Sequence, residues 1–496
     1  METNLLTYKQ RFIKNLSLLY LATFISKVFA LIINIILVRR LGVSIYGAFG
    51  FTFTFVTYFT LIADSGLSSY GETTIAKDKN NAKKAAGDIF SFNLLLSLAS
   101  FVILLLLAAK IFRFGNIQTN MLLLVSFLPL VEVFSFNYVI KALEKNQIMA
   151  LSVFLGRLIY FMGIIVFVTK KSDYFYAVLF FVIGTFLTSI IQFGFVIKLI
   201  GKIKLNFSLK NFKYLAVNGM PFGIVSALLI LYGSLPVLFL KIFSTDKNIG
   251  YYYMAGRLVF FISSFVGLIF GAFIPIMSEA IKNNDFNKQS SIISELLRFN
   301  YTFLIPVCFG AVALSRQIIS IFFGSKYLIS ASLLDIMIWS ILFMGVSSVF
   351  GGYLTSLQDK KSLILSSLFT FAIGIFLVPV LIKLFGVYGG AILSLFNEFI
   401  IVIILIIFTL RREKNKEINN RINIKISVLN ITKVLLISIL MAFIVRFLSV
   451  VLHFNLLICI ITGIFIYFVL SIIFGTLSNK DLVEIKGMIG RKNINI

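Results

Sequence analysis

Long apolar runs follow one another along almost the whole chain, and short polar segments separate them. The runs are continuous and do not alternate between apolar and polar positions, which indicates membrane helices and excludes a transmembrane β-barrel. A helix needs about 20 mostly apolar residues to cross a bilayer, and most runs reach that length. The pattern predicts about fourteen membrane helices. Their approximate bounds are 16–38, 46–66, 88–109, 120–141, 147–168, 174–197, 214–241, 250–281, 296–323, 327–357, 362–382, 387–410, 427–452 and 455–477.

The composition agrees with a polytopic all-α membrane protein. Of the 496 residues, 59% are apolar, and the mean hydropathy of +1.03 lies far outside the range of soluble proteins. Lys and Arg together number 45, against 19 Asp and Glu. Nucleic-acid binding would need a basic soluble domain, and no basic stretch lies in one. The excess therefore indicates positive charge at a membrane face, with some left for an anionic ligand, and no nucleic-acid partner is expected.

Few residues could support catalysis or metal binding. His453 is the single histidine, which largely excludes zinc sites and Ser–His–Asp chemistry. Cys308 and Cys459 lie in apolar runs, so no disulfide is expected. The chain has no Walker A glycine–lysine motif, so it does not use ATP directly. We predict a protein that is not an enzyme and has no cofactor and no metal.

The basic residues also predict the orientation. About 30 Lys and Arg fall on the side that holds both termini and every second connection, and about 12 on the other side, so both termini are predicted to be cytoplasmic. The basic start of the chain precedes an apolar run longer than a signal-peptide core, which predicts a retained first span. Arg39 and Arg40 depart from the rule, since they end the first span on the outer side. We treat them as candidates for a cavity entrance.

Weak internal similarity recurs six spans later. Leu143–Gln147 resembles Leu357–Lys361, and Ile45–Phe49 resembles Asn248–Tyr252. Repeats with an even number of spans are parallel and are related by an axis along the membrane normal. We therefore predict two six-helix bundles, with a substrate site between them near mid-bilayer. The predicted boundaries are 1–205 and 206–412 for the bundles, 413–426 for a cytoplasmic linker, and 427–496 for two extra helices with a tail.

Three basic residues lie deep inside predicted spans: Lys27, Arg157 and Arg257. Each would cost about 2.5–3.5 kcal/mol at the bilayer centre, so we expect them to face a hydrated cavity and to bind an anion, for which phosphate suits guanidinium groups well. Lys27 is too far from either helix end for its side chain to reach the interface. The alternative is pairing with acidic residues in spans. Those available are Asp64, Glu132, Glu279, Asp335 and Glu398.

Asp64 and Glu132 have two open interpretations. They could pair helices with one another by hydrogen bonding, or they could bind a coupling ion. Of the two roles, the sequence favours helix pairing.

Three segments carry a family resemblance. The stretch from Arg39 to Phe49 reads RRLGVSIYGAF, residues 61–67 read LIADSGL, and residues 71–77 read GETTIAK. They resemble the start of Wzx-type polysaccharide flippases, in the multidrug/oligosaccharidyl-lipid/polysaccharide (MOP) exporter superfamily, which also holds MATE exporters and lipid II flippases. A basic residue common in the family's third segment is replaced here by Thr73 or Thr74. The resemblance covers nearly the whole chain.

The resemblance implies a function. Wzx-type flippases move an undecaprenyl-pyrophosphate-linked oligosaccharide from the cytoplasmic to the outer leaflet of the bacterial inner membrane, for O-antigen, capsule or exopolysaccharide synthesis. Lipid II flippases place basic residues in the first and eighth helices, which Lys27 and Arg257 occupy here. The implied partners are the lipid-linked oligosaccharide, membrane lipids, a polysaccharide polymerase and a chain-length regulator.

Three other functions are considered. A cation-coupled multidrug exporter of the same superfamily would need an acidic lumen. A membrane glycan polymerase or ligase would need large outer loops, and the predicted outer loops are short. A lipid scaffold would not need charges inside spans. The exporter is the main alternative.

Overall fold

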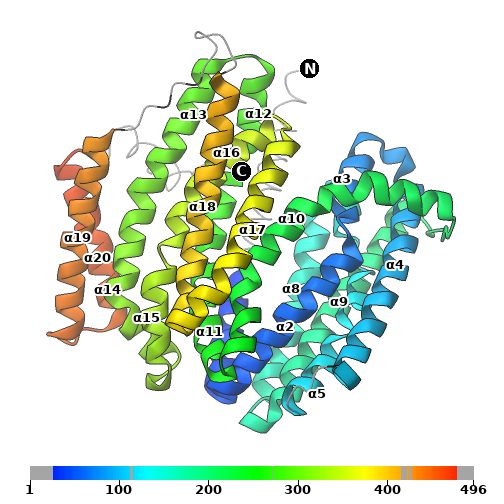
Figure 1. Cartoon of the computed structure of the whole chain (residues 1–496), viewed down its shortest axis with the longest axis horizontal. Coiled ribbons are helices and arrows are strands. Elements are labelled where there is room, and N and C mark those ends of the chain that lie inside the picture. Colours follow the sequence, from blue (N-terminus) through cyan, green and yellow to red (C-terminus); the bar gives the residue numbers. More distant parts are fainter. Residues whose placement is uncertain are drawn as a thin grey trace, which may run out of the picture. The chain divides into compact units, whose positions relative to one another are not determined.

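The computed structural model is helical throughout the residues that it describes, which are 26–111, 116–271, 273–414, 422, 424 and 427–476 (Figure 1). Within these ranges no strand occurs, and the predicted all-α membrane fold is confirmed. A first helix occupies residues 26–41 of the described chain. The others are α2 (Val43–Asp64), α3 (Leu67–Lys77), α4 (Ala82–Leu106), α5 (Asn116–Val125), α6 (Leu128–Glu132), α7 (Asn137–Ala142), α8 (Asn146–Phe167), α9 (Tyr174–Ile200), α10 (Leu209–Phe243), α11 (Asp246–Gly271), α12 (Ile274–Lys282), α13 (Phe286–Phe299), α14 (Ile305–Phe322), α15 (Leu328–Met337), α16 (Ser340–Ser356), α17 (Lys360–Phe385), α18 (Val387–Lys414), α19 (Val428–Val450) and α20 (Leu456–Ile473).

The described residues contain 12 helical stretches long and apolar enough to cross a membrane. Two predicted spans are not among them. The first is described only from residue 26. The seventh lies in α10, whose strongly apolar part is the shorter stretch Ala227–Phe243.

The predicted fourth span is not one helix. It consists of α5, α6 and α7, with Pro129 in the first turn of α6 and non-helical backbone at 133–136. Proline lacks the N–H that a continuous helix would use, which accounts for the interruption at residues 126–127 between α5 and α6, but not for the one at 133–136. Irregular backbone inside a membrane is tolerated where protein or a hydrated cavity surrounds it. The break therefore marks a place where polar groups can gather.

Contacts divide the chain into two compact units. The first unit comprises 1–261 and 367–393, and the second comprises 262–366 and 394–496. This division does not follow the boundary predicted at 205/206, because α10 packs on α2 and α3 of the first unit. The two-bundle boundaries stay a prediction.

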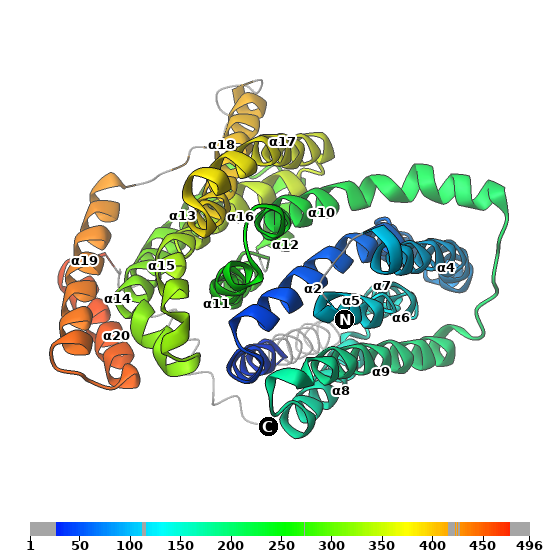
Figure 2. The ribbon, with the colours of Figure 1, turned by 60° about the horizontal axis from the view of Figure 1, so that its bottom comes forward.

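Within the first unit, α8 and α9 form a closely packed antiparallel pair, seen side by side in Figures 1 and 2. Small residues allow this approach. A Cβ on Gly156 would lie 2.0 Å from Oγ1 of Thr188, and one on Gly184 would lie 2.5 Å from the carbonyl oxygen of Gly156. Membrane helices associate through such small residues because lipid offers no hydrophobic driving force between helices.

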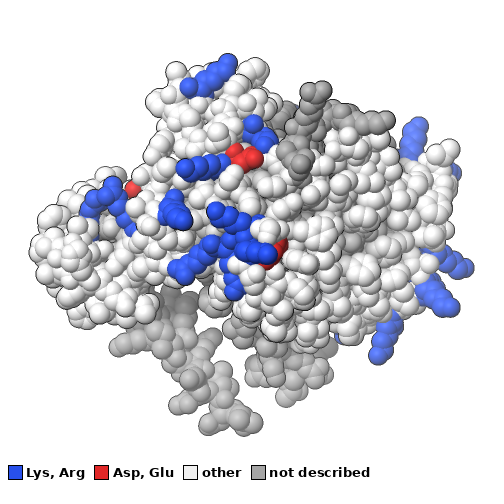
Figure 3. Space-filling model, turned by 90° about the horizontal axis from the view of Figure 1, so that it is seen from below, with Lys and Arg blue, Asp and Glu red and all other residues white. Residues whose placement is uncertain are grey.

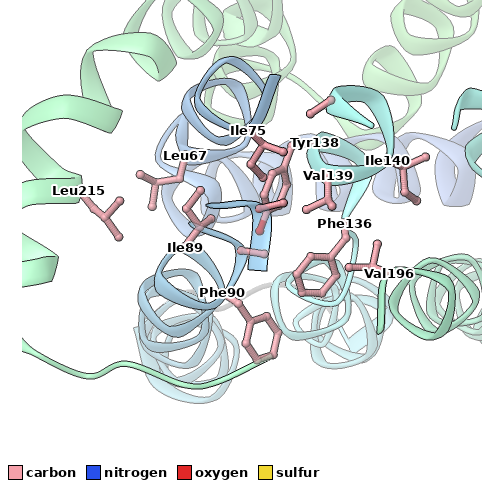
Figure 4. Close-up of a cluster of buried hydrophobic side chains, with 13 residues drawn as sticks. Leu67, Ile75, Ile89, Phe90, Phe136, Tyr138, Val139, Ile140, Val196 and Leu215 are labelled. Carbon is pink, nitrogen blue, oxygen red and sulfur yellow. The ribbon is translucent and has the colours of Figure 1, made fainter. Parts of the chain in front are cut away.

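A cluster of buried side chains joins α3, α4, α7, α9 and α10 in the first unit (Figure 4). Leu67, Ile75 and Ile89 are each at most 1% exposed, and Tyr138 is 4% exposed. A Cβ on Gly71 would lie 2.6 Å from the Tyr138 ring and 2.7 Å from Ile89. The cluster thus fixes α3 against α7, next to the break in the fourth span.

In the second unit, the two C-terminal helices α19 and α20 pack on α14. Met441 and Val445 of α19 fill the space beside Gly463 of α20. Tyr467 of α20 donates a hydrogen bond to the carbonyl oxygen of Thr302, which lies in a π-helical turn before α14. Most of the remaining surface of α19 and α20 is exposed and apolar, as expected of helices that face lipid.

Figure 3 looks at the lower end of the helices of Figure 1, and basic side chains predominate over acidic ones there. In the first unit this end holds the α8–α9 and α10–α11 connections, predicted to be on the outer side (Figure 1). Basic residues therefore also occur at the end predicted to be the outer one. The predicted orientation depends on their larger number at the other end and stays a prediction.

Candidate functional site

The first unit contains a cavity of about 470 Å³, whose walls come from α2, α3, α4, α6, α7, α8 and α9. Three of the seven residues singled out in the sequence line it: Asp64, Glu132 and Arg157. Most other wall residues are polar. They include Thr60, Ser68, Asn93, Ser97, Ser135, Asn137, Thr185, Thr188 and Ser189, with the phenols of Tyr138 and Tyr160.

Asp64 is the last residue of α2, and its carboxylate is oriented by the next turn. Ser68 donates two hydrogen bonds to its Oδ1, one from the hydroxyl and one from the backbone N–H at 3.2 Å. The turn needs left-handed backbone at Ser65 (φ 46°) and Gly66 (φ 77°). Glycine adopts such angles without steric cost, which explains its place here.

Glu132 is the last residue of α6, just before the break in the fourth span, and it is exposed within the cavity. The charges of Asp64 and Glu132 act on one another. Neither forms an ion pair with a basic residue of the described chain. Two like charges in one cavity favour uptake of a proton or a cation.

Arg157 approaches the same cavity from α8 and is partly buried. The other residues of α8 that line the cavity are Val153, Gly156 and Tyr160. No ion pair joins Arg157 to any carboxylate among the described residues. The alternative considered for the sequence is that a nearby carboxylate neutralises Arg157. Among the described residues, no carboxylate does so.

Arg257 lies on α11 and is held by Tyr253. It donates a hydrogen bond to the hydroxyl of Tyr253, and its Cζ lies 4.4 Å from the centre of that ring. Its charge also acts on the hydroxyl of Tyr46 on α2. Nε of Arg257 is buried and has no hydrogen-bond partner among the described residues. Arg257 does not line the cavity, but its charge acts on that of Arg157.

Lys27 is partly buried on the helix of residues 26–41 and does not line the cavity. Phe29, two residues further on, packs edge-to-face on Phe154 and Phe161, with ring centres 6.0 and 5.2 Å apart. The helix that carries Lys27 therefore packs on α8, which carries Arg157. The structure places these two residues on neighbouring helices without bringing both into one cavity.

Arg40 has a role that the sequence did not suggest. Its Nη1 donates to the carbonyl oxygens of Ile164, Ile165 and Val168 at 2.9, 2.9 and 2.6 Å. Ile164 and Ile165 lie in the last turn of α8 and Val168 directly after it, at a helix end that favours positive charge. Arg40 thus caps α8. Arg39 is exposed, and a role for either residue at a cavity entrance stays a proposal.

Sequence reasoning missed three polar groups of the cavity. Oδ1 of Asn93, Oδ1 of Asn137 and the hydroxyl of Tyr138 are buried and lack a hydrogen-bond partner in the part of the chain that the structure describes. Buried polar groups are nearly always hydrogen-bonded, so unpaired ones facing a cavity indicate a ligand or ordered water. Asn93 could have been found, because it interrupts an apolar run.

Comparison with known proteins places the chain among polysaccharide-related membrane proteins. A family model described as "Polysaccharide biosynthesis protein" matches residues 12–281, more than half of the 496 residues. The probable low-salt glycan biosynthesis flippase Agl15 of Haloferax volcanii is 25% identical over 161 residues. That match covers 32% of this chain and 34% of the relative, so the chain aligns with about a third of the relative's length.

Solved structures share the fold. A lipid II flippase MurJ in an inward closed conformation superposes with a TM-score of 0.74 at 20% identity, covering 94% of this chain and 99% of that one. An inward-facing MATE family multidrug resistance transporter of the MOP superfamily gives a TM-score of 0.67 at 15% identity, covering 79% of this chain and 96% of that one. At such identities the likeness shows the fold alone, and that fold is the one predicted from the sequence.

Proposed function

Since this chain belongs to the polysaccharide biosynthesis protein family, we propose that it is a flippase for an undecaprenyl-pyrophosphate-linked oligosaccharide. It moves this lipid from the cytoplasmic to the outer leaflet of a bacterial inner membrane, for O-antigen, capsule or exopolysaccharide synthesis. Both termini are cytoplasmic in this proposal. No covalent bond is made or broken, so the protein is a transporter and not an enzyme.

The observation that carries the proposal is the state of two arginines inside membrane helices. Arg157 and Arg257 form no ion pair with a carboxylate among the described residues. Keeping both charged in an apolar helix costs roughly 5–7 kcal/mol on insertion scales, so they need a compensating function. A pyrophosphate supplies the missing negative charge, and guanidinium groups bind its oxygens through paired, charge-assisted hydrogen bonds.

Lys27 is proposed as a third basic group of this anion site. Its helix packs on α8 through Phe29, which keeps it near the helix that carries Arg157. A lysine adds a point charge without the directional fork of arginine. The polyprenyl tail stays in lipid while the head group passes through the protein by alternating access.

Asp64 and Glu132 are proposed to bind the coupling ion. They interact electrostatically, line one cavity and have no basic partner within the described chain. The amide oxygens of Asn93 and Asn137 lack donors and face the same cavity. Carboxylate and amide oxygens suit a hard cation such as Na⁺, and the carboxylates alone suit a proton. Pairing of helices with one another explains these unpaired groups less well.

The two carboxylates also favour a second candidate, a cation-coupled multidrug exporter of the same superfamily. Their cavity would attract a cationic drug. Arg157 in the same cavity opposes this, because it repels such a ligand. We therefore rank the exporter second. A polysaccharide polymerase and a chain-length regulator are proposed protein partners.

Purified protein in vesicles tests the proposal. A fluorescent lipid-linked oligosaccharide is placed in the inner leaflet, and its arrival in the outer leaflet is read by an impermeant quencher. We expect translocation by the wild type and its loss in a Lys27→Ala/Arg257→Ala double variant. Lys84→Ala and Arg411→Gln, exposed basic positions, are the matched controls. Transport of a cationic dye in place of the lipid would support the exporter and refute the flippase.

A further inference from the structure

Helices α2 and α11 touch through their backbones within the first unit. A Cβ on Gly47 would lie 1.8 Å from the carbonyl oxygen of Asp246, and a Cβ on Gly250 would lie 2.1 Å from that of Val43. No real side chain fits at these distances, so the contact requires glycine at both positions. We call it the α2–α11 contact. It lies at the first turns of both helices, the end predicted to face outward.

The α2–α11 contact continues inward through two tyrosine rings. A Cβ on Gly50 would lie 2.6 Å from Cγ of Tyr253, so the ring of Tyr253 occupies the space that this glycine leaves. The rings of Tyr253 and Tyr46 lie 5.6 Å apart. Tyr46 is fully buried and donates a hydrogen bond to Oδ1 of Asn34 at 2.7 Å. The rings of Tyr46 and Tyr253 thus fill the space between α2 and α11 next to Gly47 and Gly250.

Arg257 lies over the ring of Tyr253, one of this pair. It lies four residues after Tyr253, on the same face of α11. Its guanidinium hydrogen-bonds Tyr253, and the ring of Tyr253 packs against Gly50 and Tyr46 of α2, so Arg257 holds the ring that joins the two helices. Nε of Arg257 has no partner within the described residues, so the group's donors are not all used.

A pyrophosphate would compete with Tyr253 for Arg257. Hydrogen bonds from a cation to an anion are roughly twice as strong as those between neutral groups, and phosphate oxygens match the guanidinium fork. A phenol offers one neutral oxygen, and the fork needs two acceptors side by side. An arriving phosphate therefore displaces the phenol, and the link between α2 and α11 is lost.

From this we propose that Tyr253, packed on Tyr46, is a positioning residue that holds Arg257 while the α2–α11 contact is closed. A pyrophosphate that takes its place on Arg257 releases the contact. The inference rests on the proposed function, because it takes the ligand of Arg257 to be a lipid pyrophosphate. It makes opening of this end of the first unit dependent on the head group, so an empty transporter stays closed there.

Spin labels at the contact measure its state. The free, buried Cys308 and Cys459 are first replaced by Ser. Labels are then attached to Ser44→Cys in the first turn of α2 and Lys247→Cys in the first turn of α11, both exposed positions. Distances are measured in vesicles with undecaprenyl pyrophosphate or with uncharged undecaprenol. We expect the pyrophosphate to raise the population of longer distances roughly fivefold or more, the lower end of typical coupling between sites, and undecaprenol to have no effect.

Three variants separate this mechanism from simple packing. Tyr46→Phe/Tyr253→Phe keeps both rings and removes their oxygens, and we expect longer distances already without ligand. Arg257→Gln should no longer respond to pyrophosphate. Tyr58→Phe is the matched control, since its hydroxyl bonds Ser234 of α10 at 2.6 Å and not Arg257. If the double variant does not fold, Gly47→Ala tests the contact instead, because its Cβ also forces α2 from α11.

The results distinguish two failures. Translocation of the labelled lipid-linked oligosaccharide is measured in the same vesicles. Translocation without any pyrophosphate-dependent change in distance would overturn the role of Tyr46 and Tyr253 and leave the flippase proposal intact. Absence of translocation in the wild type would refute the flippase itself. A double variant that behaves as the wild type in both assays would also overturn the inference.

Discussion

Two polar clusters of the first unit place charged side chains among apolar helices, and they differ in how those charges are partnered. In one, Nζ of Lys241 lies 2.8 Å from Oδ1 of Asp246 and 2.7 Å from Oε1 of Gln118. Nε2 of Gln118 donates to the same Asp246 oxygen at 2.8 Å. These three side chains form a closed triangle in which each polar group meets a complementary one.

The cavity is the opposite case. Asp64, Glu132 and Arg157 share it, yet no ion pair joins any two of them. Two amide oxygens and a phenol beside them also lack partners among the described residues. A cluster that serves stability completes its own hydrogen bonds, as the triangle does. The difference teaches that the cavity is built for something that comes from outside the chain.

Removing Arg157 should have the largest effect on translocation. Arg157→Gln removes a charge that no carboxylate of the described chain neutralises, so the fold loses little. If the pyrophosphate uses two charge-assisted hydrogen bonds of this side chain, its loss slows translocation by about 100-fold or more. The vesicle assay measures the rate, and Arg411→Gln serves as the control. A rate within a factor of about two of the wild type would remove Arg157 from the anion site.

Glu132→Gln should give the next largest effect. With Asp64 it is proposed to hold the coupling ion, so its neutral isostere weakens the response to an imposed Na⁺ or H⁺ gradient. We expect the gradient-driven increase in rate to fall about tenfold, the equivalent of about 1.4 kcal/mol of ion binding. Transport without a gradient should persist.

The matched control for Glu132→Gln is Glu295→Gln, an exposed position on α13. If Glu132→Gln responds to both gradients as the wild type does, and melts at a lower temperature, then Glu132 stabilises helix packing. That outcome would support the other interpretation, in which Asp64 and Glu132 pair helices by hydrogen bonding.

The sequence determined the helices well because a bilayer imposes a simple rule on length and hydropathy. It did not predict the break between α6 and α7. Residues 133–136 read VFSF, so three of the four are apolar and hydropathy does not register a turn. Only the packing of α7 on α3, through Gly71 and Tyr138, requires the chain to turn there.

The sequence singles out three charged residues of the cavity, but not its uncharged polar residues and not their arrangement. Charges inside apolar runs identify Asp64, Glu132 and Arg157. Their common cavity depends on how each helix is rotated, which follows from contacts between helices far apart in the sequence. The same limit applies to Arg40, since the acceptors of its hydrogen bonds lie more than 120 residues away on α8.

Lys241→Met tests the triangle, for which we expect loss of stability without loss of function. Gln118 is 3% exposed, so removal of Lys241 leaves its carbonyl buried without a partner. We expect the free energy of unfolding to fall by about 1–3 kcal/mol. Thermal melting in detergent measures this, with Lys247→Met as the control. Normal melting combined with lost translocation would show that the triangle belongs to the transport machinery.

Asp359 in the second unit should give the smallest effect, and it extends the comparison to another fully partnered charge. Ser362 donates to it from N and Oγ at 3.1 and 3.0 Å, and Arg412 donates at 2.6 Å. Burial alone would raise its pKa, but the hydrogen bonds from Ser362 and Arg412 outweigh burial and lower it. A lowered folded-state pKa stabilises the fold above the carboxyl's ordinary value near about 4, and this stabilisation disappears as the pH falls through the folded-state pKa.

Asp359→Asn should therefore lower stability by about 0.5–1 kcal/mol at pH 7, since partly exposed ion pairs and caps contribute little. The difference from the wild type should shrink on acidification below about pH 4. Thermal melting from pH 3 to pH 7 measures it, and Asp285→Asn, whose side chain caps α13 without an arginine, serves as the control. If the difference in melting temperature between the variant and the wild type stays constant across this range, the charge of Asp359 contributes nothing to stability. The Lys241–Asp246–Gln118 triangle would then be the only one of these two partnered clusters that stabilises the fold.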